Sequence, residues 1–317
     1  MTNTKTKLNA WIQVQKIPRH SNDVFSLVLG SVLAWYHVGQ FNWLVFIASL
    51  LAVFCIANGI YLTNEAQDYE GDKRNVERIG VGGGMNLTST GGTQVLVAGH
   101  LKREHVQLVG MLFFAAAIPL GLIVQFGGHT GWLTIPIGTL GIFVTYSYSN
   151  PPIKASYRGL GETCMMLGYA MLVFTAYYIH AGLVDWWIPL IVALPRILTV
   201  PALKVIRNFP DAAADAESGK RTSVVIFGKE RMRWVYIALV VGAVLSFAFV
   251  VIETKSLFAI INLWPAALFI QSLIPVFNGQ WKERAGIARA CKKGFKGLLL
   301  IPITLTMTLL LSAWFHI

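Results

Sequence analysis

Two short clusters of carboxylates follow long apolar runs in this 317-residue chain. The first lies in YLTNEAQDYEGDKRN and the second in RNFPDAAADAESGKRT. Each cluster has an Asn followed by two Asp residues that are four positions apart: Asn64, Asp68 and Asp72, then Asn208, Asp211 and Asp215. Residues four apart share one face of a helix, with about 6 Å between successive side chains. The repeated pattern predicts one site assembled from two helix ends.

Facing carboxylates repel one another unless cations lie between them. The clusters offer oxygen ligands with no adjacent His or Cys, which favours Mg²⁺ over zinc or copper. Mg²⁺ leaves coordination positions open for phosphate oxygens, and the Lys and Arg residues after each cluster suit the same anion. We therefore expect a pair of Mg²⁺ ions and a diphosphate. The alternative is that the carboxylates are solvated helix ends that pair with neighbouring Lys and Arg residues.

Two loops supply further candidate residues. In YSYSNPPIKASYRGLGE, a Pro-Pro pair stiffens the turn and is expected to hold Tyr148, Lys154 and Arg158 over the site. The other reading is an ordinary loop whose charges only set topology. The glycine-rich stretch GVGGGMNLTSTGG has no nucleotide-binding context, because no strand and no GKS or GKT sequence accompanies it. It is predicted to be a mobile cap with glycine hinges.

The apolar segment before the second cluster carries a polar stripe. Its members recur in steps of three, four or eight residues: Arg196, Lys204, Asn208, Asp211 and Asp215. Arg196 is expected near the bilayer midplane, where a lone Arg is costly and marks function by default. The other reading is an Arg that is buried against helix dipoles and backbone carbonyls. Three prolines, Pro195, Pro201 and Pro210, predict a broken helix, which membranes tolerate where backbone lines a cavity.

The composition identifies the surroundings in which these clusters act. The chain is 55% hydrophobic and only 13% charged, with a mean hydropathy of +0.58, which is typical of an integral membrane protein. The long apolar runs lack the alternation of barrel strands, so we predict an all-α membrane protein with about nine transmembrane helices around a central cavity. The predicted spans are 24–37, 43–62, 106–126, 132–148, 163–181, 186–206, 235–252, 257–277 and 298–315.

The basic residues predict the orientation. Nearly all of the 26 Lys and Arg residues fall on one side of this nine-span map, and Lys255 and Arg196 are the exceptions. By the positive-inside rule, the N-terminus and both acidic clusters are cytoplasmic and the C-terminus is outside. The net charge of +11 then reflects topology and anionic lipids, not nucleic-acid binding. We expect a single domain over 1–317, with a cytoplasmic tail over 1–22 and cytoplasmic caps over about 66–105 and 208–233.

The motifs resemble those of the UbiA superfamily of intramembrane prenyltransferases, over nearly the whole chain. NEAQDYEGD and DAAAD are similar to its NDxxDxxxD and DxxxD motifs, and YSNPPIK, YRGLGE and TGGTQVLVAG match further blocks. SGKRTSVVIFG resembles the GKRTLAVRLG of the 1,4-dihydroxy-2-naphthoate branch, which serves menaquinone biosynthesis. One departure is Glu65, where the family usually has Asp. We expect this change to alter the geometry around the metal and not to abolish metal binding.

The resemblance implies an enzyme in which Mg²⁺ binds the diphosphate of an allylic polyprenyl donor, and an electron-rich aromatic ring attacks the allylic carbon. The implied metal ligands are Asn64, Asp68, Asp72, Asp211 and Asp215, and the four Asp residues are the implied catalytic groups. The substrate-binding candidates are Asn64, Arg78, Tyr148, Lys154, Arg158, Arg196, Lys204, Asn208 and Lys220. Among these, Arg196 and Lys204 are the available cations for an acceptor carboxylate.

The leading prediction is prenylation of 1,4-dihydroxy-2-naphthoate in a bacterial inner membrane. Within the family, the alternative acceptors are 4-hydroxybenzoate, homogentisate, chlorophyllide and a glyceryl phosphate. A terpene cyclase of the same fold is a mechanistic rival. A transporter or Mg²⁺ channel is disfavoured, because both acidic clusters lie on one side of the membrane. A soluble prenyl diphosphate synthase also has twin Asp motifs, but its helices would not be uniformly apolar.

Overall fold

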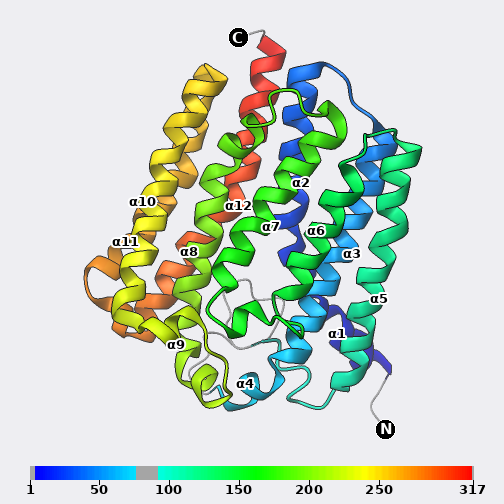
Figure 1. The fold of residues 1–317 in the computed structure, drawn as a ribbon. Coiled ribbons are helices and arrows are strands. Elements are labelled where there is room, and N and C mark those ends of the chain that lie inside the picture. Colours follow the sequence, from blue (N-terminus) through cyan, green and yellow to red (C-terminus); the bar gives the residue numbers. More distant parts are fainter. Residues whose placement is uncertain (1–3, 76–91, 316–317) are drawn as a thin grey trace.

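In a computed structural model of the chain, residues 4–75 and 92–315 are described, and they form a bundle of long helices (Figure 1). These are α2 (Ile17–Val38), α3 (Trp43–Gln67), α5 (Arg103–Leu122), α6 (Thr134–Ser147), α7 (Gly161–Ala181), α8 (Ile188–Glu217), α10 (Lys229–Thr254), α11 (Leu263–Phe277) and α12 (Arg284–Phe315). Shorter elements are α1 (Thr4–Gln15), α4 (Tyr69–Arg74), η2 (Ile123–Gly127), η3 (Ala155–Tyr157), α9 (Ser223–Phe227), η4 (Leu257–Asn262) and η5 (Gln280–Lys282). The predicted all-α class is confirmed.

Each predicted span coincides with one of these long helices. Within the described residues, seven helical segments are long and apolar enough to cross a membrane: α3, α5 with η2, α7, α8, α10, η4 with α11, and α12. Helix α6 is apolar but has only 14 residues. Helix α2 has 22 residues but begins with polar side chains. The structure therefore agrees with an integral membrane protein, and the count of nine crossings stays a prediction.

Several helices, α2, α8 and α12 among them, extend beyond their predicted bounds, because polar residues at their ends belong to the helix. Helix α2 begins at Ile17, with Pro18 in its first turn, whereas the apolar run begins at Val24. Helix α8 continues as far as Glu217, so the second acidic cluster is helical. The expected break in this helix was wrong, because α8 is continuous through all three of its internal prolines.

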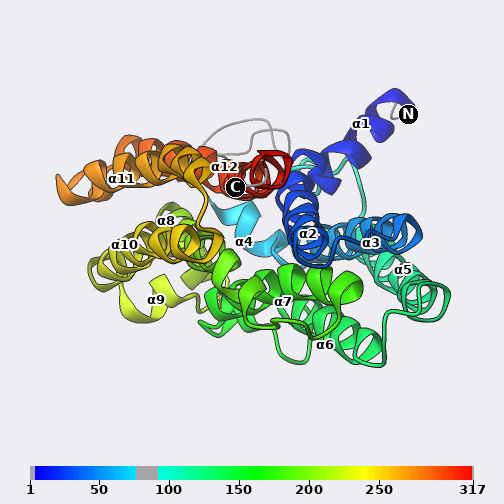
Figure 2. The ribbon, with the colours of Figure 1, turned by 90° about the horizontal axis from the view of Figure 1, so that it is seen from above.

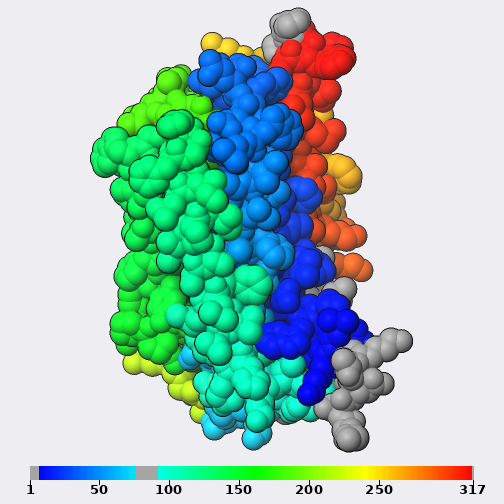
Figure 3. All heavy atoms as spheres, turned by 90° about the vertical axis from the view of Figure 1, so that its right-hand side faces the viewer, coloured from blue at the N-terminus to red at the C-terminus, as the bar shows by residue number. Residues whose placement is uncertain are grey.

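Close helix contacts depend on small residues. On α3, Gly59 faces Phe114 of α5, where an added Cβ would lie 2.8 Å from the ring. On α5, Gly110 faces Thr63 in the same way, at 2.7 Å from its methyl group. Small residues at such contacts let helix backbones approach closely, which favours packing in lipid. The outer surface is different: large apolar side chains of α5, such as Leu112, are exposed, and α5 lies on the face shown in Figure 3.

The helices surround a central space in which α4 lies across one end (Figure 2). Residues of α2, α3, α6, α7, α8 and α12 line this space, and α10 and α11 lie farther out. The end of α3, the end of α8, α9 and the N-terminus share one end of the bundle, and the C-terminus lies at the other (Figure 1). The two acidic clusters therefore share one end, as the charge pattern predicts. Most of the glycine-rich stretch, together with Arg78, lies outside the described residues.

Labelling with a membrane-impermeant thiol reagent tests the predicted orientation. In a chain whose three cysteines are replaced by Ala, we introduce Cys at Lys282 or at Trp132, which are both exposed. Lys282 lies in the segment between α11 and α12 and Trp132 in the segment before α6, and these segments are at opposite ends of the bundle (Figure 1). Lys282→Cys should react only after the cytoplasmic side is opened, and Trp132→Cys should react from outside. Equal reaction of both in sealed cells would contradict the charge-based topology.

Candidate active site

The first acidic cluster lies where α3 passes into α4. Helix α3 ends at Gln67, and Asp68 links it to α4. The helical hydrogen bonds continue across this junction: the Asp68 N–H donates to the Asn64 carbonyl and the Asp72 N–H donates to the Asp68 carbonyl, each at 2.9 Å. The Asn64 amide also donates to Asp68 Oδ2 at 3.0 Å. The predicted shared face is thus preserved through the change of helix.

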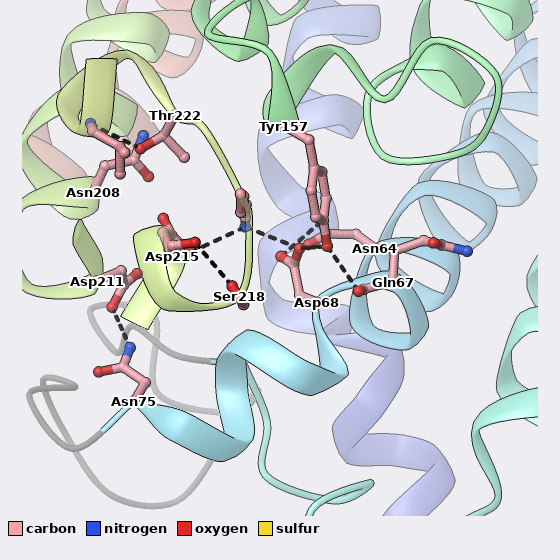
Figure 4. A network of polar contacts seen from close by, with 12 residues as sticks. Asn64, Gln67, Asp68, Asn75, Tyr157, Asn208, Asp211, Asp215, Ser218 and Thr222 are labelled. Carbon is pink, nitrogen blue, oxygen red and sulfur yellow. Dashed lines mark hydrogen bonds and ion pairs between the residues drawn. The ribbon is translucent and has the colours of Figure 1, made fainter. Parts of the chain in front are cut away.

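Lys220 joins the first cluster to the second by contacting Asp68 and Asp215, both of which are labelled in Figure 4. Its Nζ lies 2.9 Å from Asp68 Oδ1 and 3.7 Å from Asp215 Oδ1. The turn after α8 fixes its backbone, because the Lys220 N–H donates to the Asp215 carbonyl at 2.8 Å. The Tyr157 hydroxyl adds a donor to Asp68 Oδ1 at 2.8 Å. We call Asn64, Asp68, Asp72, Asp211, Asp215 and Lys220 the acidic mouth.

The loops that carry Tyr157 and Lys220 are held against each other. The Arg221 N–H donates to the Tyr157 carbonyl at 3.1 Å, which pairs the YRGLGE and SGKRT segments. The Tyr157 hydroxyl also donates to the Gln67 carbonyl at the end of α3. Tyr157 was not among the predicted site residues, although it lies in a quoted motif. Nothing in the sequence shows that its hydroxyl, in contrast to the neighbouring charges, would reach Asp68.

The two ionic partners at this contact stabilise each other's charged forms. Burial alone raises the pKa of Asp68, but the Lys220 ammonium, with the Tyr157 hydroxyl, outweighs burial and holds that pKa below its usual value. Burial lowers the pKa of Lys220, but Asp68 and Asp215 outweigh it and raise that pKa well above its usual value. Lys220 therefore carries a fixed positive charge between the two clusters.

The acidic mouth contains two further carboxylates, which do not contact Lys220 directly. Asp211 accepts a hydrogen bond from the Asn75 amide at 2.7 Å. Asp72 contacts Gly92, where φ is +66° and an added Cβ would overlap the carboxylate. Burial, together with Glu65 and Asp68 nearby, raises the pKa of Asp72 well above its usual value. Burial and crowding thus disfavour the charged form of Asp72, and a cation bound beside it would favour that form.

A cavity of about 400 Å³ extends inward from the acidic mouth, and all six mouth residues line it. Farther in, its walls are mostly apolar and include Ile56, Ile137, Met171, Leu172 and Ile179. A second hollow of about 180 Å³ adjoins the mouth beneath Tyr157. A charged entrance thus opens into a cavity whose walls are mostly apolar.

The donor set at the mouth fits Mg²⁺. In the part of the chain that the structure describes, no three Asp, Glu, His or Cys side chains converge on one point. Mg²⁺ is commonly held by one or two carboxylates together with substrate phosphates, so a three-carboxylate cluster is not required. The donors here are carboxylates and the Asn64 amide oxygen, which are hard ligands, and a divalent cation would relieve the repulsion between neighbouring carboxylates such as Asp68 and Asp72.

The structure places some of the other predicted residues on the cavity and others away from it. Tyr148, Lys204 and Asn208 line the cavity, and Lys204 Nζ lies 5.8 Å from the centre of the Tyr148 ring. Lys154 lines the second hollow. Arg158 lines neither: it is exposed, and its guanidinium donates to the Pro152 carbonyl at 3.1 Å. Its predicted role over the site is therefore not supported by its placement.

Arg196 requires a correction. It is fully buried and does not line the cavity, because its guanidinium donates to the carbonyls of Leu298, at 2.9 Å, and Asn22, at 2.6 Å. It thus ties α8 to α12 and α2, and the alternative of an Arg buried against carbonyls describes it better than contact with an acceptor. Two arginines that sequence reasoning missed, Arg19 and Arg207, do line the cavity.

Glu65, the departure from the family motif, forms a buried ion pair. Its Oε2 lies 2.7 Å from the Nζ of Lys16, which precedes α2, and both side chains are at most 5% exposed. Its Oε1 accepts hydrogen bonds from the backbone N–H of Thr93, at 2.7 Å, and from the Thr93 hydroxyl. Glu65 thus connects the start of α2, the end of α3 and the loop that contacts Asp72.

The fold and site agree with the comparisons with known proteins. A model of the UbiA prenyltransferase family matches residues 24–314, so the chain belongs to the UbiA prenyltransferase family. The resemblance predicted from the motifs is confirmed, and with it the class of the protein: an integral membrane enzyme family that transfers prenyl groups.

Similar proteins include two curated bacterial relatives. A 2-carboxy-1,4-naphthoquinone phytyltransferase of Synechocystis sp. is 24% identical over 220 residues, which cover 69% of this chain and 66% of that protein. A 1,4-dihydroxy-2-naphthoate octaprenyltransferase of Bacillus subtilis is 24% identical over 205 residues, covering 64% of this chain and 60% of that protein. The chain thus matches less than two thirds of the length of either relative.

Solved structures share the fold. A UbiA homolog from Archaeoglobus fulgidus, bound to GPP and Mg²⁺, superposes with a TM-score of 0.60 at 15% sequence identity. The match covers 93% of this chain and 99% of that one. At this identity the likeness concerns the fold alone.

A double-mutant cycle tests the contribution of the buried Lys16–Glu65 pair. Lys16→Met should lower the free energy of unfolding by about 3–5 kcal/mol, because it leaves a buried carboxylate without its cation. Adding Glu65→Leu should recover much of that loss. The measurement is denaturant unfolding in detergent. Glu230→Gln, at the exposed Glu230–Arg233 pair, is the control and should cost at most about 1 kcal/mol. A similar small cost for Lys16→Met would show that Glu65 is not held by this pair.

Proposed function

We propose that this protein catalyses the Mg²⁺-dependent transfer of a polyprenyl group from an allylic diphosphate to 1,4-dihydroxy-2-naphthoate. The observation that carries the proposal is the acidic mouth, where two carboxylate clusters meet around Lys220 at the entrance of an apolar cavity. A diphosphate with bound cations matches the mouth, and an isoprenoid chain matches the cavity walls. Both halves of a prenyl diphosphate thus find complementary surfaces in one continuous site.

The mouth supplies ligands of both signs for the donor. Asp68, Asp72, Asp211 and Asp215, with Asn64, are the residues that would hold Mg²⁺. When bound, Mg²⁺ neutralises the diphosphate and stabilises the negative charge that develops as it departs. Lys220 lies between the clusters and contributes a further cation from the protein. The Mg²⁺ and GPP named for the Archaeoglobus fulgidus neighbour support this assignment, and the number of ions here remains part of the proposal.

The reaction forms a carbon–carbon bond between the acceptor ring and the allylic carbon, and it breaks the bond from that carbon to the diphosphate oxygen. The allylic carbon gains positive charge as the bond breaks, so water must be kept away from it. The apolar cavity walls behind the mouth provide that exclusion. Tyr148 lines this cavity near Lys204 and presents an aromatic face that can stabilise positive charge.

The acceptor is assigned from two supports. Both curated relatives are named for naphthalene-ring substrates, 1,4-dihydroxy-2-naphthoate in one case and 2-carboxy-1,4-naphthoquinone in the other. The cavity also contains cations that suit the carboxylate of such an acceptor, namely Lys204, Arg19 and Arg207. We accordingly place the protein in menaquinone-type quinone biosynthesis, in a bacterial inner membrane, with the acidic mouth facing the cytoplasm.

Activity of the purified protein tests the function. With farnesyl diphosphate and a panel of acceptors, we expect prenylation of 1,4-dihydroxy-2-naphthoate that EDTA abolishes and Mg²⁺ restores. Asp68→Ala and Asp211→Ala should each reduce turnover by at least about 10²-fold, because each removes a ligand for the cations that stabilise the leaving group.

The control is Glu283→Ala, an exposed carboxylate at the same end of the bundle, which should retain wild-type turnover. Unfolding curves of all three variants separate loss of activity from loss of structure. Full activity of the two Asp variants would exclude the metal site. Prenylation of only a non-carboxylated acceptor, or cyclisation of the donor alone, would replace the naphthoate assignment.

A further inference from the structure

A further carboxylate, which is not part of the acidic mouth, lines the cavity. Asp23 is in α2, about 9 Å along the helix from its first residue, and it lines the cavity wall. The Tyr169 hydroxyl of α7 donates to its Oδ1 at 2.8 Å. Among the described residues, no hydrogen bond to its Oδ2 is found, and no Lys or Arg forms an ion pair with it. Asp23 therefore has one carboxylate oxygen committed and one available on the cavity side.

A positively charged side chain, Arg196, lies near Asp23 but forms no ion pair with it. The Arg196 guanidinium stacks over the Tyr169 ring, with its central carbon 4.7 Å from the ring centre. Its terminal nitrogens donate to the carbonyls of Leu298 and Asn22, so Arg196 interacts with Asp23 electrostatically without forming an ion pair with it. Asp23 is half-buried and has no ion-pair partner among the described residues, and ionisable groups of this kind within a membrane bundle mark functional sites.

A purely structural role would make Asp23 an anchor between α2 and α7. That contact does not need a carboxylate, because the Gly30 backbone already meets α7, where an added Cβ would lie 2.5 Å from the Val173 carbonyl. An Asn would accept the Tyr169 hydrogen bond equally well. What a carboxylate adds is the capacity to take a proton.

Other polar groups around Asp23 fit an aromatic acceptor. Tyr61 of α3 lines the same cavity and interacts electrostatically with Asp23, Arg19 and Arg207. Its ring stacks on His20, with centroids 5.2 Å apart and planes 11° from parallel. Together these residues offer a proton acceptor, two cations and an aromatic wall. This combination suits a planar ring that carries a hydroxyl group and an anionic substituent.

We propose that Asp23 binds a hydroxyl group of the aromatic acceptor and removes its proton, so that the enzyme selects hydroxyarenes. The inference rests on the proposed prenyl transfer. The hydroxyl proton passes to Asp23 Oδ2, and the resulting oxyanion makes the ring a stronger nucleophile. A ring carbon then bonds to the allylic carbon as the bond to diphosphate breaks. The attacked carbon releases its proton to the departing diphosphate, and Asp23 returns its proton to the ring oxygen.

Asp23→Asn is the decisive variant, because it keeps the size of the side chain and its bond from Tyr169 but is not a base. We expect kcat for a hydroxyarene acceptor to fall by about 10²–10⁴-fold. The KM for the prenyl diphosphate should stay within about twofold, and so should the slow release of diphosphate when no acceptor is present. A structural defect would instead reduce donor binding and diphosphate release together with prenyl transfer.

The pH dependence of the variant distinguishes the loss of a base from a packing defect. Phenolic hydroxyls ionise near pH 10, so the deficit of Asp23→Asn should shrink as the pH rises towards that value. The groups that face Asp23 are Tyr169, Arg196 and Tyr61, with Arg19 on its own helix. Tyr169→Phe is the matched control: it retains the carboxylate, so its smaller deficit should not depend on pH in this way.

A measurement on the unmodified protein covers the case in which Asp23→Asn does not fold. The wild-type enzyme should prenylate the acceptor at least about 10²-fold faster than the same acceptor with its hydroxyl groups methylated. Comparable rates for the two acceptors would overturn the role of Asp23, as would wild-type turnover by Asp23→Asn. If the wild-type enzyme transferred no prenyl group to any acceptor, the proposed function itself would fail instead.

Discussion

The structure depends on holding two carboxylate clusters together at the end of an apolar bundle. Two such clusters repel each other, and the repulsion grows as water is excluded. Lys220 resolves this by lying between Asp68 and Asp215 with a fixed charge. The arrangement constrains the chain widely: α8 has to stay helical through its prolines to Glu217, and the turn after it has to return Lys220 to the mouth. A single cation still leaves the mouth negative, which is why it suits divalent ions and an anionic ligand.

Much of this architecture is encoded locally in the sequence. The nine apolar runs coincide with long helices, because a chain in lipid has to satisfy its backbone hydrogen bonds within each segment. The spacing of four in each cluster also specifies which side chains share a face, and α3 keeps that face across the junction at Asp68. Patterns that depend only on helix periodicity and on charge placement could therefore be predicted.

What could not be predicted depends on contacts between distant segments. Arg196 has the same spacing as the polar stripe on α8, yet it points to carbonyls of α12 and α2 instead of the cavity. Tyr157 reaches Asp68 only because two loops pair, and Lys16 meets Glu65 from a different helix end. The periodicity of a single segment does not identify such partners, because a polar residue within an apolar run forms hydrogen bonds or ion pairs with whichever segment packs against it.

The positions of the charged residues in the cavity correspond to different steps of the proposed prenyl transfer. Net negative charge at the mouth attracts cations, and with them the diphosphate, so the leaving group is held at the entrance. Asp23 lies on the cavity wall outside the mouth, where a base can take the hydroxyl proton of an acceptor. A short-lived cation has to meet a nucleophile that is already activated. A base fixed by Tyr169 on the inner wall meets this need, because it acts on the acceptor before the donor ionises.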